Sequence, residues 1–300
     1  MNRSDSITHY LEQTSKRINR ELETIFRDDM NIPPSLKKSM EYSLHAGGKR
    51  IRPILVLAAV EALNGNVDDA LPVSCAVELV HTYSLIHDDL PALDNDDLRR
   101  GKPTNHKIYG EAMAIMAGDA LLTHAFYQIA SMKQKNLPAD RLLRIVEELS
   151  WFAGPRGMVG GQVADLEGEQ GITSLAQLEY IHRHKTGDLI VFSLRAGGHL
   201  ANADEEQLEA LEQFGFAIGL AFQIQDDILD RIGNEEKIGK RLHSDEKQEK
   251  VTFPYFLGLE ECIRAVKEYT NKGKQAILQA EIPNPERLLE LADYLMNRDY

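Results

Sequence analysis

The 300-residue sequence predicts an all-α protein. Apolar residues recur at the three- and four-residue spacing of a helix along most of the chain, and no run alternates as a strand for long. Hydrophobic residues make up 43% of the sequence, which is enough for a buried core, and no segment has the composition of a linker. We therefore expect roughly ten or more helices in one domain that spans residues 1–300.

Prolines and capping residues divide the first half of the chain into helices. Pro33-Pro34 marks a break after the first predicted helix. Pro53 stands at the head of an apolar run, where the missing N–H of proline costs no hydrogen bond. Asp68 or Asp69 is expected to cap the long helix that carries His81 to Asp88. The other predicted helices cover residues 7–26, 36–44, 54–63, 111–130 and 141–152.

Glycines and charged residues divide the second half. Gly154 to Gln162 is rich in glycine where a helix would otherwise continue, and close helix contact or a kink explains this as well as ligand contact does. A predicted helix at 175–184 is interrupted at Lys185-Thr186-Gly187 before helical periodicity resumes at 189–200. We interpret the highly charged stretch from Arg231 to Lys250 as a solvated loop or as a lid over a charged ligand. Three more helical runs are expected between Thr252 and Arg298.

Charge and composition exclude several classes of function. The net charge of −13 argues against nucleic acid as the main partner. Apolar runs stop short of the ~20 residues that a membrane span needs, and the first residues lack the apolar region of a signal peptide. The two cysteines, Cys75 and Cys262, are expected to be reduced core thiols. We therefore expect a cytoplasmic protein.

A cluster of aspartates follows the helix that carries His81 to Asp88. Clustered carboxylates repel one another unless a cation lies among them, and hard oxygen ligands suit Mg²⁺, which usually also holds substrate phosphates. The two arginines that come next add bidentate recognition of the same phosphates. After them, Gly101-Lys102-Pro103 is expected to be a loop. The residues of this motif are Asp88, Asp89, Asp94, Asp96, Asp97, Arg99 and Arg100.

A second apolar helix, Phe214 to Gln225, also ends in carboxylates, at Asp226-Asp227 and Asp230. Asp226 and Asp230 are four residues apart, about 40° around a helix, so both point from one face. Asp88 and Asp94 would lie roughly 120° apart on an unbroken helix. Pro91 disrupts the backbone hydrogen bonds, so the extra residues can bulge out and return Asp94 towards Asp88.

Basic residues form a third motif at Gly47-Gly48-Lys49-Arg50-Ile51-Arg52-Pro53. Glycines and cations at the head of an apolar helix predict an anion cradle, although an ordinary basic turn explains them equally well. His81 lies seven residues before Asp88, about 20° away around the helix, which places it on the same side. Without that context His81 would be interpreted as a core histidine.

In this order, the motifs resemble those of the short-chain trans-prenyltransferases, the family of the bacterial farnesyl diphosphate synthases. The likeness spans nearly the whole chain and includes Gly47 to Pro53, Asp88 to Asp94 with Arg99-Arg100, Lys185-Thr186-Gly187, Phe222-Gln223 before Asp226 to Asp230, and Gly239-Lys240. One aspartate motif would be weak support, whereas two in order with four flanking motifs make a chance match very improbable. The resemblance implies the isoprenoid synthase fold, a single large helical bundle around a central cavity, in one polyprenyl synthase domain at 1–300. It also implies a homodimer.

The resemblance further implies a role for each motif. About three Mg²⁺ ions, with Mn²⁺ as an alternative, would be held with the allylic diphosphate by both aspartate motifs. Arg99, Lys185 and Lys240 would also contact that diphosphate. Lys250, in the charged stretch interpreted as a lid, is a further candidate for substrate binding. A second diphosphate, of isopentenyl diphosphate, would be held by Gly48, Lys49, Arg52, His81 and Arg100. Lys185, Thr186 and Gln223 would line the path of the carbocation. The implied metal ligands are Asp88, Asp89, Asp94, Asp226, Asp227 and Asp230.

The implied reaction is a head-to-tail condensation of isopentenyl diphosphate with dimethylallyl and geranyl diphosphate, which yields (2E,6E)-farnesyl diphosphate and pyrophosphate. Ser84 lies four residues before Asp88 on the same face, and Tyr83 lies beside it. A small residue followed by an aromatic floor predicts a C15 product. Synthases of geranyl or geranylgeranyl diphosphate remain the alternatives within the family.

Two departures from the family pattern and three rival functions bear on this hypothesis. His243 stands where the family usually has a glycine after the lid lysine, and Pro155-Arg156 is unusual in the glycine-rich segment. A helical metal phosphohydrolase could use His87-Asp88, but it would leave the second aspartate motif unexplained. A terpene cyclase would not need a second diphosphate site. A non-catalytic partner subunit would be expected to have lost some of the six motif aspartates, and all six are present.

Overall fold

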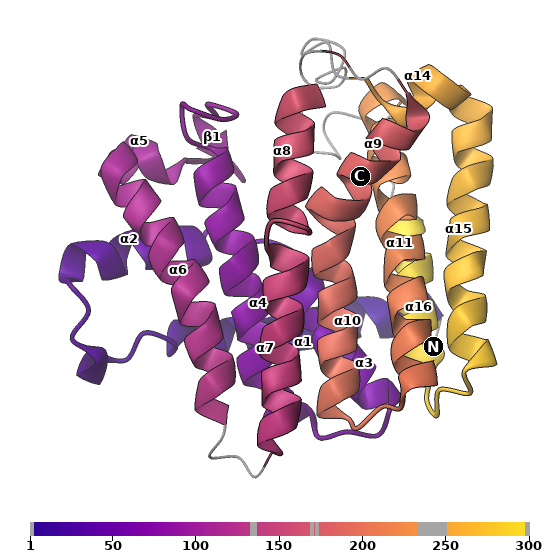
Figure 1. Cartoon of the computed structure of the whole chain (residues 1–300), viewed down its shortest axis with the longest axis horizontal. Helices are drawn as coiled ribbons and strands as arrows, with labels where there is room; N and C mark the ends of the chain where they lie inside the picture. Colours follow the sequence, from indigo (N-terminus) through magenta and orange to yellow (C-terminus); the bar gives the residue numbers. More distant parts are fainter. Residues whose placement is uncertain (1–2, 133–136, 169–170, 172–173, 233–250, 298–300) are drawn as a thin grey trace. The chain divides into compact units, whose positions relative to one another are not determined.

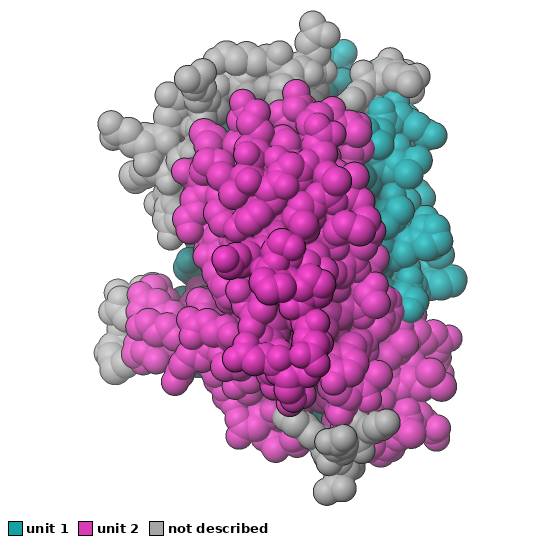
Figure 2. All heavy atoms as spheres, turned by 90° about the vertical axis from the view of Figure 1, so that its left-hand side faces the viewer, with its two compact units in different colours: residues 1–7, 58–65, 148–300 teal, residues 8–57, 66–147 magenta. Residues whose placement is uncertain are grey.

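The computed structural model describes residues 3–132, 137–168, 171, 174–232 and 251–297. Within these ranges the chain is helical almost throughout, which confirms the all-α prediction (Figure 1). The residue contacts divide the chain into two compact units, which Figure 2 shows in different colours. We call residues 8–57 and 66–147 the N-terminal unit, and residues 1–7, 58–65 and 148–300 the C-terminal unit.

The first half of the chain follows the predicted order of helices. Pro34 begins one helix and Pro53 lies in the first turn of the next, where backbone N–H groups have no partner within the helix. The elements are α1 (Arg3–Glu23), a 3₁₀ turn (Asp28–Met30), α2 (Pro34–Leu44), α3 (Ile51–Ala62), α4 (Val67–Asp88), β1 (Leu98–Arg99), β2 (Lys102–Pro103), α5 (Asn105–Tyr109) and α6 (Glu111–Ser131).

Asn66 caps the long helix α4, so the prediction that Asp68 or Asp69 does so was wrong. The Asn66 side chain accepts a hydrogen bond from the Asp68 amide at 3.1 Å. The helix begins at Val67, and this places both aspartates in its first turn. There their charges are favourable to the positive end of the helix dipole.

Helix α4 is buried on nearly all sides and forms the core of the N-terminal unit. Its buried residues occupy every face of the helix, as is typical of a helix surrounded by others. It packs along α6 (Figure 1). The ring of His87 occupies the space left by Gly118, because a Cβ there would lie 2.1 Å from His87 Nε2. The lack of a side chain at Gly118 therefore allows close packing of α6 on α4.

The segment after the first aspartate motif is a small hairpin, although the sequence indicated a loop. Strands β1 and β2 pair antiparallel, with Arg99 opposite Lys102. The two residues between them, Arg100 and Gly101, have φ of 53° and 74°. Positive φ at both central positions is the requirement of a type I′ turn, which matches the twist of a hairpin.

The second half of the chain is also helical, with the expected three helices after Thr252. Helix α11 packs against α10 and α15, which lie on either side of it in Figure 1. The elements are α7 (Ala139–Ala153), α8 (Met158–Gly168), α9 (Leu175–His182), a π-helix (Arg183–Gly187), α10 (Asp188–Leu200), α11 (Glu205–Ile232), α14 (Phe253–Leu257), α15 (Leu259–Gln279) and α16 (Glu286–Met296).

Two boundaries in this half differ from the prediction. The interruption at Lys185 is a widened π-helical stretch that joins α9 to α10, so the chain stays helical through it. Helix α11 does not end at its carboxylates but continues to Ile232. Asp226 and Asp230 are therefore both on helical backbone, as their shared face requires.

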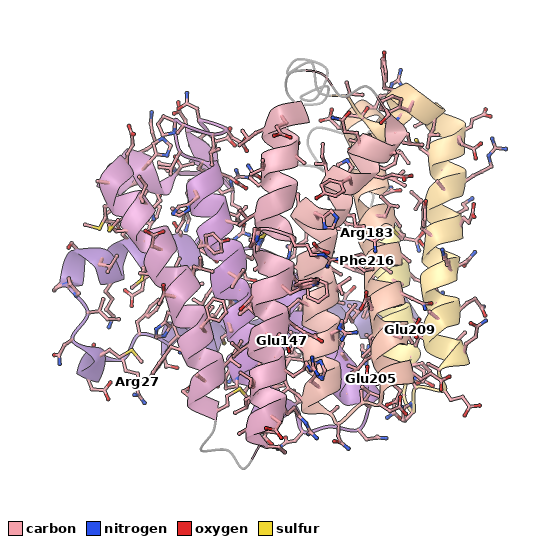
Figure 3. All side chains as sticks on the ribbon, viewed as in Figure 1. Arg27, Glu147, Arg183, Glu205, Glu209 and Phe216 are labelled. Atoms are coloured by element: carbon pink, nitrogen blue, oxygen red, sulfur yellow. The ribbon has the colours of Figure 1, made fainter. Side chains whose placement is uncertain are left out.

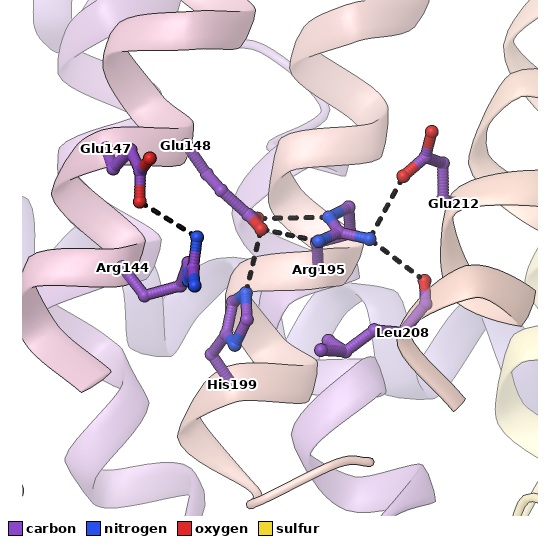
Figure 4. A network of polar contacts seen from close by, with 7 residues as sticks. All are labelled: Arg144, Glu147, Glu148, Arg195, His199, Leu208 and Glu212. Carbon is purple, nitrogen blue, oxygen red and sulfur yellow. Dashed lines mark hydrogen bonds and ion pairs between the residues drawn. The ribbon is translucent and has the colours of Figure 1, made fainter. Parts of the chain in front are cut away.

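A buried polar network joins three helices of the C-terminal unit (Figure 4). Arg195 of α10 donates to Glu148 of α7 at 3.1 Å and to Glu212 of α11 at 3.0 Å. His199 also contacts Glu148, with Nε2 and Oε1 2.9 Å apart. Burial opposes ionisation of Glu148, but the hydrogen bonds from His199 and Arg195 outweigh this and lower its pKa. The network fixes how these helices pack.

None of the described helices combines the length and the apolar composition that crossing a membrane requires.

Candidate active site

The first aspartate motif folds back on itself at the end of α4. The helix ends at Asp88, and the Asp94 amide donates a hydrogen bond to the Asp88 carbonyl at 2.9 Å. This confirms that Asp94 returns towards Asp88. The mechanism differs from the predicted bulge, because the helix stops and a turn through Pro91 closes the gap. Asn95 has φ of 53°, a left-handed conformation that asparagine adopts readily.

Arginine and lysine side chains balance part of this cluster. Arg99 Nε donates to Asp89 Oδ1 at 2.9 Å, and Arg99 Nη2 lies 3.2 Å from Asp96. Asp89 is only 3% exposed, and this burial raises its pKa against the opposing effect of Arg99. Lys107 pairs with Asp97 at 2.8 Å. Arg99 was predicted to bind diphosphate. In the structure it contacts Asp89 and Asp96 of the motif that is predicted to bind the metal ions of that diphosphate.

In the second aspartate motif, as in the first, one aspartate is more buried than the others. Asp227 is 9% exposed, and its Oδ2 accepts the Phe253 amide at 2.8 Å, which attaches the start of α14 to α11. Asp226 and Asp230 are less buried and share a face of α11. In each motif, therefore, the second aspartate of the pair makes structural hydrogen bonds.

The donor chemistry of both motifs fits Mg²⁺, which prefers carboxylate oxygens. Across the described ranges, no three or more His, Cys, Asp and Glu side chains come close enough together to form a metal-binding group. The carboxylates of the first motif concentrate negative charge at the end of α4. The cations Arg99 and Lys107 take part of that charge.

The basic motif meets the first aspartate motif through Arg100. Its guanidinium donates to the Gly47 carbonyl and lies against Gly48, where an added Cβ would be 2.6 Å from Arg100 Cζ. Arg52 Nη1 lies 3.5 Å from His81 Nε2. Lys49 is exposed near the end of the loop that contains Gly47 and Gly48. The structure thus brings together four of the residues predicted to hold the second diphosphate, all within the N-terminal unit: Gly48, Arg52, His81 and Arg100.

The electrostatics of this group favour an anion. Burial lowers the pKa of Arg52 to about 10, and Arg100 contributes to the shift. The pKa of His81 is lowered well below its usual range by burial and by Arg52 and Arg100, so His81 is neutral near pH 7. The buried Arg52 Nε has no hydrogen-bond partner within the described part of the chain. An unsatisfied buried donor is costly, and a bound anion would satisfy it.

The two residues predicted to set product length differ in burial. Tyr83 is 6% exposed, burial raises its pKa to about 12, and its ring contacts His87 edge to face. Ser84 is half-buried, and its hydroxyl donates to the His81 carbonyl at 2.9 Å. His87, on which the phosphohydrolase hypothesis depended, lies against the Ile115 carbonyl of α6 at 3.2 Å.

Lys185 lies in the π-helix, where Asp165 of α8 holds it. Lys185 Nζ and Asp165 Oδ2 are 2.5 Å apart. Helix α8 approaches so closely because of Gly161, where a Cβ would lie 2.2 Å from the Lys185 amide nitrogen. Helix contact therefore explains at least this glycine of the glycine-rich segment. Thr186 follows in the same π-helix, and Gln223 is half-buried on α11.

Two side-chain contacts beside Lys185 were missed from the sequence. His184 Nδ1 contacts Asp188 Oδ2 at 2.7 Å, and Asp188 is 3% exposed. Arg183 stacks over the ring of Phe216 at 4.0 Å (Figure 3). His184 and Asp188 are four residues apart, a spacing that brings side chains together on a helix, so the sequence carried a signal of this pair, although it lies outside the motifs. Lys240, Lys250 and His243 lie outside the described residues.

Comparison with known proteins agrees with these motifs. The family model described as polyprenyl synthetase matches residues 33–283. A farnesyl diphosphate synthase of Bacillus subtilis is 48% identical over 99% of this chain and 100% of its own length. A geranylgeranyl diphosphate synthase of Cyanophora paradoxa is 47% identical over 89% of each chain. The crystal structure of a geranyltransferase from Legionella pneumophila matches with a TM-score of 0.87 and 33% identity, covering 99% of both chains. The chain belongs to the polyprenyl synthetase family.

Proposed function

We propose that the protein is a prenyltransferase that condenses isopentenyl diphosphate head to tail with dimethylallyl and then geranyl diphosphate. The products are (2E,6E)-farnesyl diphosphate and pyrophosphate. One observation supports this proposal: Arg52 Nη1 lies 3.5 Å from His81 Nε2, and the charges of Arg52 and Arg100 both act on His81, as a second diphosphate site would require. A reaction that joins two substrates, each with its own diphosphate group, needs a second diphosphate site. The relatives named farnesyl diphosphate synthase support the proposed reaction.

The six motif aspartates are proposed to hold Mg²⁺, about three ions in all, with Mn²⁺ as an alternative. When bound, the ions would stabilise the negative charge on the pyrophosphate that leaves the allylic substrate. Arg99, Lys185 and Lys240 are proposed to bind that diphosphate with them. Lys185, Thr186 and Gln223 would line the path of the carbocation. The released pyrophosphate accepts the proton, so the protein needs no base of its own.

The test is incubation of the purified protein with Mg²⁺, isopentenyl diphosphate and geranyl diphosphate, followed by chromatography of the dephosphorylated products. We expect farnesol, and no product in excess chelator. Asp88→Ala and Asp226→Ala should lower turnover by orders of magnitude while helical circular dichroism stays at the wild-type level. Full condensation without divalent ions would contradict the proposal.

The two anion sites predict separate effects on the two substrates. Lys49→Ala, Arg52→Ala and His81→Ala should raise KM for isopentenyl diphosphate, because each removes a contact to that substrate only. Arg99→Ala should act mainly through the allylic substrate. Equal effects of all four variants on both substrates would show that the division is wrong.

A C15 product is proposed from Tyr83 and Ser84, which precede Asp88 by about one helical turn. Tyr83→Ala should remove the aromatic floor and yield C20 or longer products, and Ser84→Phe should favour C10. An unchanged C15 distribution from both variants would show that other residues form the floor. A wild-type product of C10 or C20 would favour the geranyl or geranylgeranyl alternative, the latter being the name of the Cyanophora relative.

We also propose a homodimer, a single domain and a cytoplasmic location. Helix α6 exposes Ile115, Met116 and Tyr127, with Met116 and Tyr127 more than half exposed, and an apolar helix face of this kind is typical of an interface. Light scattering should give twice the chain mass, and Met116→Glu should lower the measured mass.

The family match across 33–283 supports one polyprenyl synthase domain. Both cysteines are unpaired and buried, which is consistent with a reducing compartment.

A further inference from the structure

Arg50 lies inside the basic motif, yet it does not face the solvent as Lys49 does. Arg50 is only 4% exposed. Its backbone is left-handed, with φ of 53°, and its carbonyl accepts the Ile54 amide at 3.0 Å, which begins α3. A non-glycine residue held in this conformation is costly unless its surroundings fix it. Arg52 follows in the first turn of the helix that Arg50 begins.

The guanidinium of Arg50 joins three other helices of the N-terminal unit. Nε donates to Asn19 Oδ1 of α1 at 2.9 Å. Nη1 donates to Glu78 Oε1 of α4 at 2.5 Å, and Nη2 donates to the Leu44 carbonyl at the end of α2 at 2.7 Å. Each nitrogen of the guanidinium therefore has a partner, and each partner lies on a different helix. Only the planar, multiply donating head of arginine can do this.

Glu78 connects this contact to the anion site. Glu78 and His81 are three residues apart on α4 and so share a face. The Arg50 and Glu78 side chains are each 2% exposed. The carboxylate also acts at longer range on Arg52 and Arg100, whose charges it favours. Glu78 pairs directly with Arg50, while Arg52 Nη1 lies 3.5 Å from His81 Nε2.

We propose that Arg50 and Glu78 are positioning residues of the anion site formed by Arg52, His81 and Arg100. They hold the start of α3 and the loop before it in the conformation that binds the diphosphate of isopentenyl diphosphate. This role rests on the proposed function. In this role Arg50 supports the site but does not touch the substrate. Glu78, which no sequence motif indicated, supports the site in the same way.

The decisive variant is the double replacement Arg50→Met/Glu78→Met. It removes one positive and one negative charge, so the net charge near the site is unchanged and an effect reports geometry. Replacing both members of a buried ion pair with apolar residues is often neutral for stability. We expect cooperative unfolding near the wild-type midpoint in urea. KM for isopentenyl diphosphate should rise about tenfold, the factor for one charge-assisted hydrogen bond. KM for geranyl diphosphate should stay unchanged.

Two further variants keep the test decisive. Arg50→Lys retains the charge opposite Glu78 but cannot reach three helices, so KM for isopentenyl diphosphate should rise while the protein stays folded. The matched control is Arg195→Met/Glu148→Met, the same replacement in the buried pair of the C-terminal unit, which should not shift that KM selectively.

Wild-type KM values in the Arg50→Lys or double variant, or an equal rise for both substrates, would overturn the positioning role. If the wild-type protein itself made no prenyl product, the proposed function would fail instead, so the two failures are distinguishable.

Discussion

At the scale of single residues, the two aspartate motifs use their members unequally. Asp89 pairs with Arg99, and Asp227 accepts the Phe253 amide, and both are buried. The first and last aspartates of each motif are less buried. The sequence alone could identify six important carboxylates, because each motif is a short stretch whose aspartate number and spacing can be counted directly. It could not rank them, because the partners that bury Asp89 and Asp227 lie about ten and 26 residues away in the chain.

Asp188 supplies a prediction at this scale. Burial raises its pKa from 3.8 to about 6, although His184, Arg183 and Arg156 act against this. The folded protein therefore holds this proton more tightly than the unfolded chain does. The resulting contribution to the free energy of unfolding is fully present below pH 3.8 and is lost as the pH rises through about 6. A shift of this size corresponds to roughly 3 kcal/mol at most.

The replacement Asp188→Asn should remove this contribution. Compared with the wild-type protein, the variant should lose less stability between pH 4 and pH 7, as measured by urea unfolding at each pH. Glu167→Gln, on the exposed surface of α8, is the matched control and should keep the wild-type slope. Parallel curves for the wild-type protein and Asp188→Asn would contradict the assignment.

At the scale of elements, most helices could be predicted and their interruptions could not. Helices α6, α7 and α15 have apolar periodicity or clear limits that a single sequence displays. An irregularity at Lys185 was predicted, but the structure shows a π-helix there instead of a break, with Gly161 of α8 packed closely against it. The partner of Lys185, Asp165, was also missed. Contacts between helices come from tertiary packing, which periodicity does not encode.

Gly161→Ala tests the contact between α8 and the π-helix. The added Cβ would lie 2.2 Å from the Lys185 nitrogen and 2.7 Å from the His184 carbonyl carbon, and both of these are backbone atoms that cannot move independently. Overpacking of this kind costs about 1–3 kcal/mol in unfolding free energy. Because Lys185 must shift, kcat should fall as well. Glu167→Ala on the same helix should change neither quantity, and wild-type kcat in Gly161→Ala would show that Lys185 does not depend on this contact.

At the scale of the whole molecule, each compact unit carries one aspartate motif, and the proposed function assigns both motifs to the same ligand. The N-terminal unit carries Asp88, Asp89 and Asp94, and the C-terminal unit carries Asp226, Asp227 and Asp230. A ligand that binds only the folded protein stabilises it by about 2.7 kcal/mol at one hundred times its Kd. Whether one motif can bind without the other is therefore measurable as a change in melting temperature.

Mg²⁺ together with inorganic pyrophosphate should raise the melting temperature of the wild-type protein. Either one alone should give a smaller rise, because the carboxylates and the pyrophosphate are both anionic and need the cation between them. If the two motifs hold one set of ions, Asp88→Ala and Asp226→Ala should each abolish nearly the whole shift. If the motifs bind separately, each variant should keep about half of it and the double variant none. Differential scanning fluorimetry of the three variants with and without the ligands distinguishes these outcomes, and Asp97→Ala, whose carboxylate pairs with Lys107, is the control that should retain the wild-type shift.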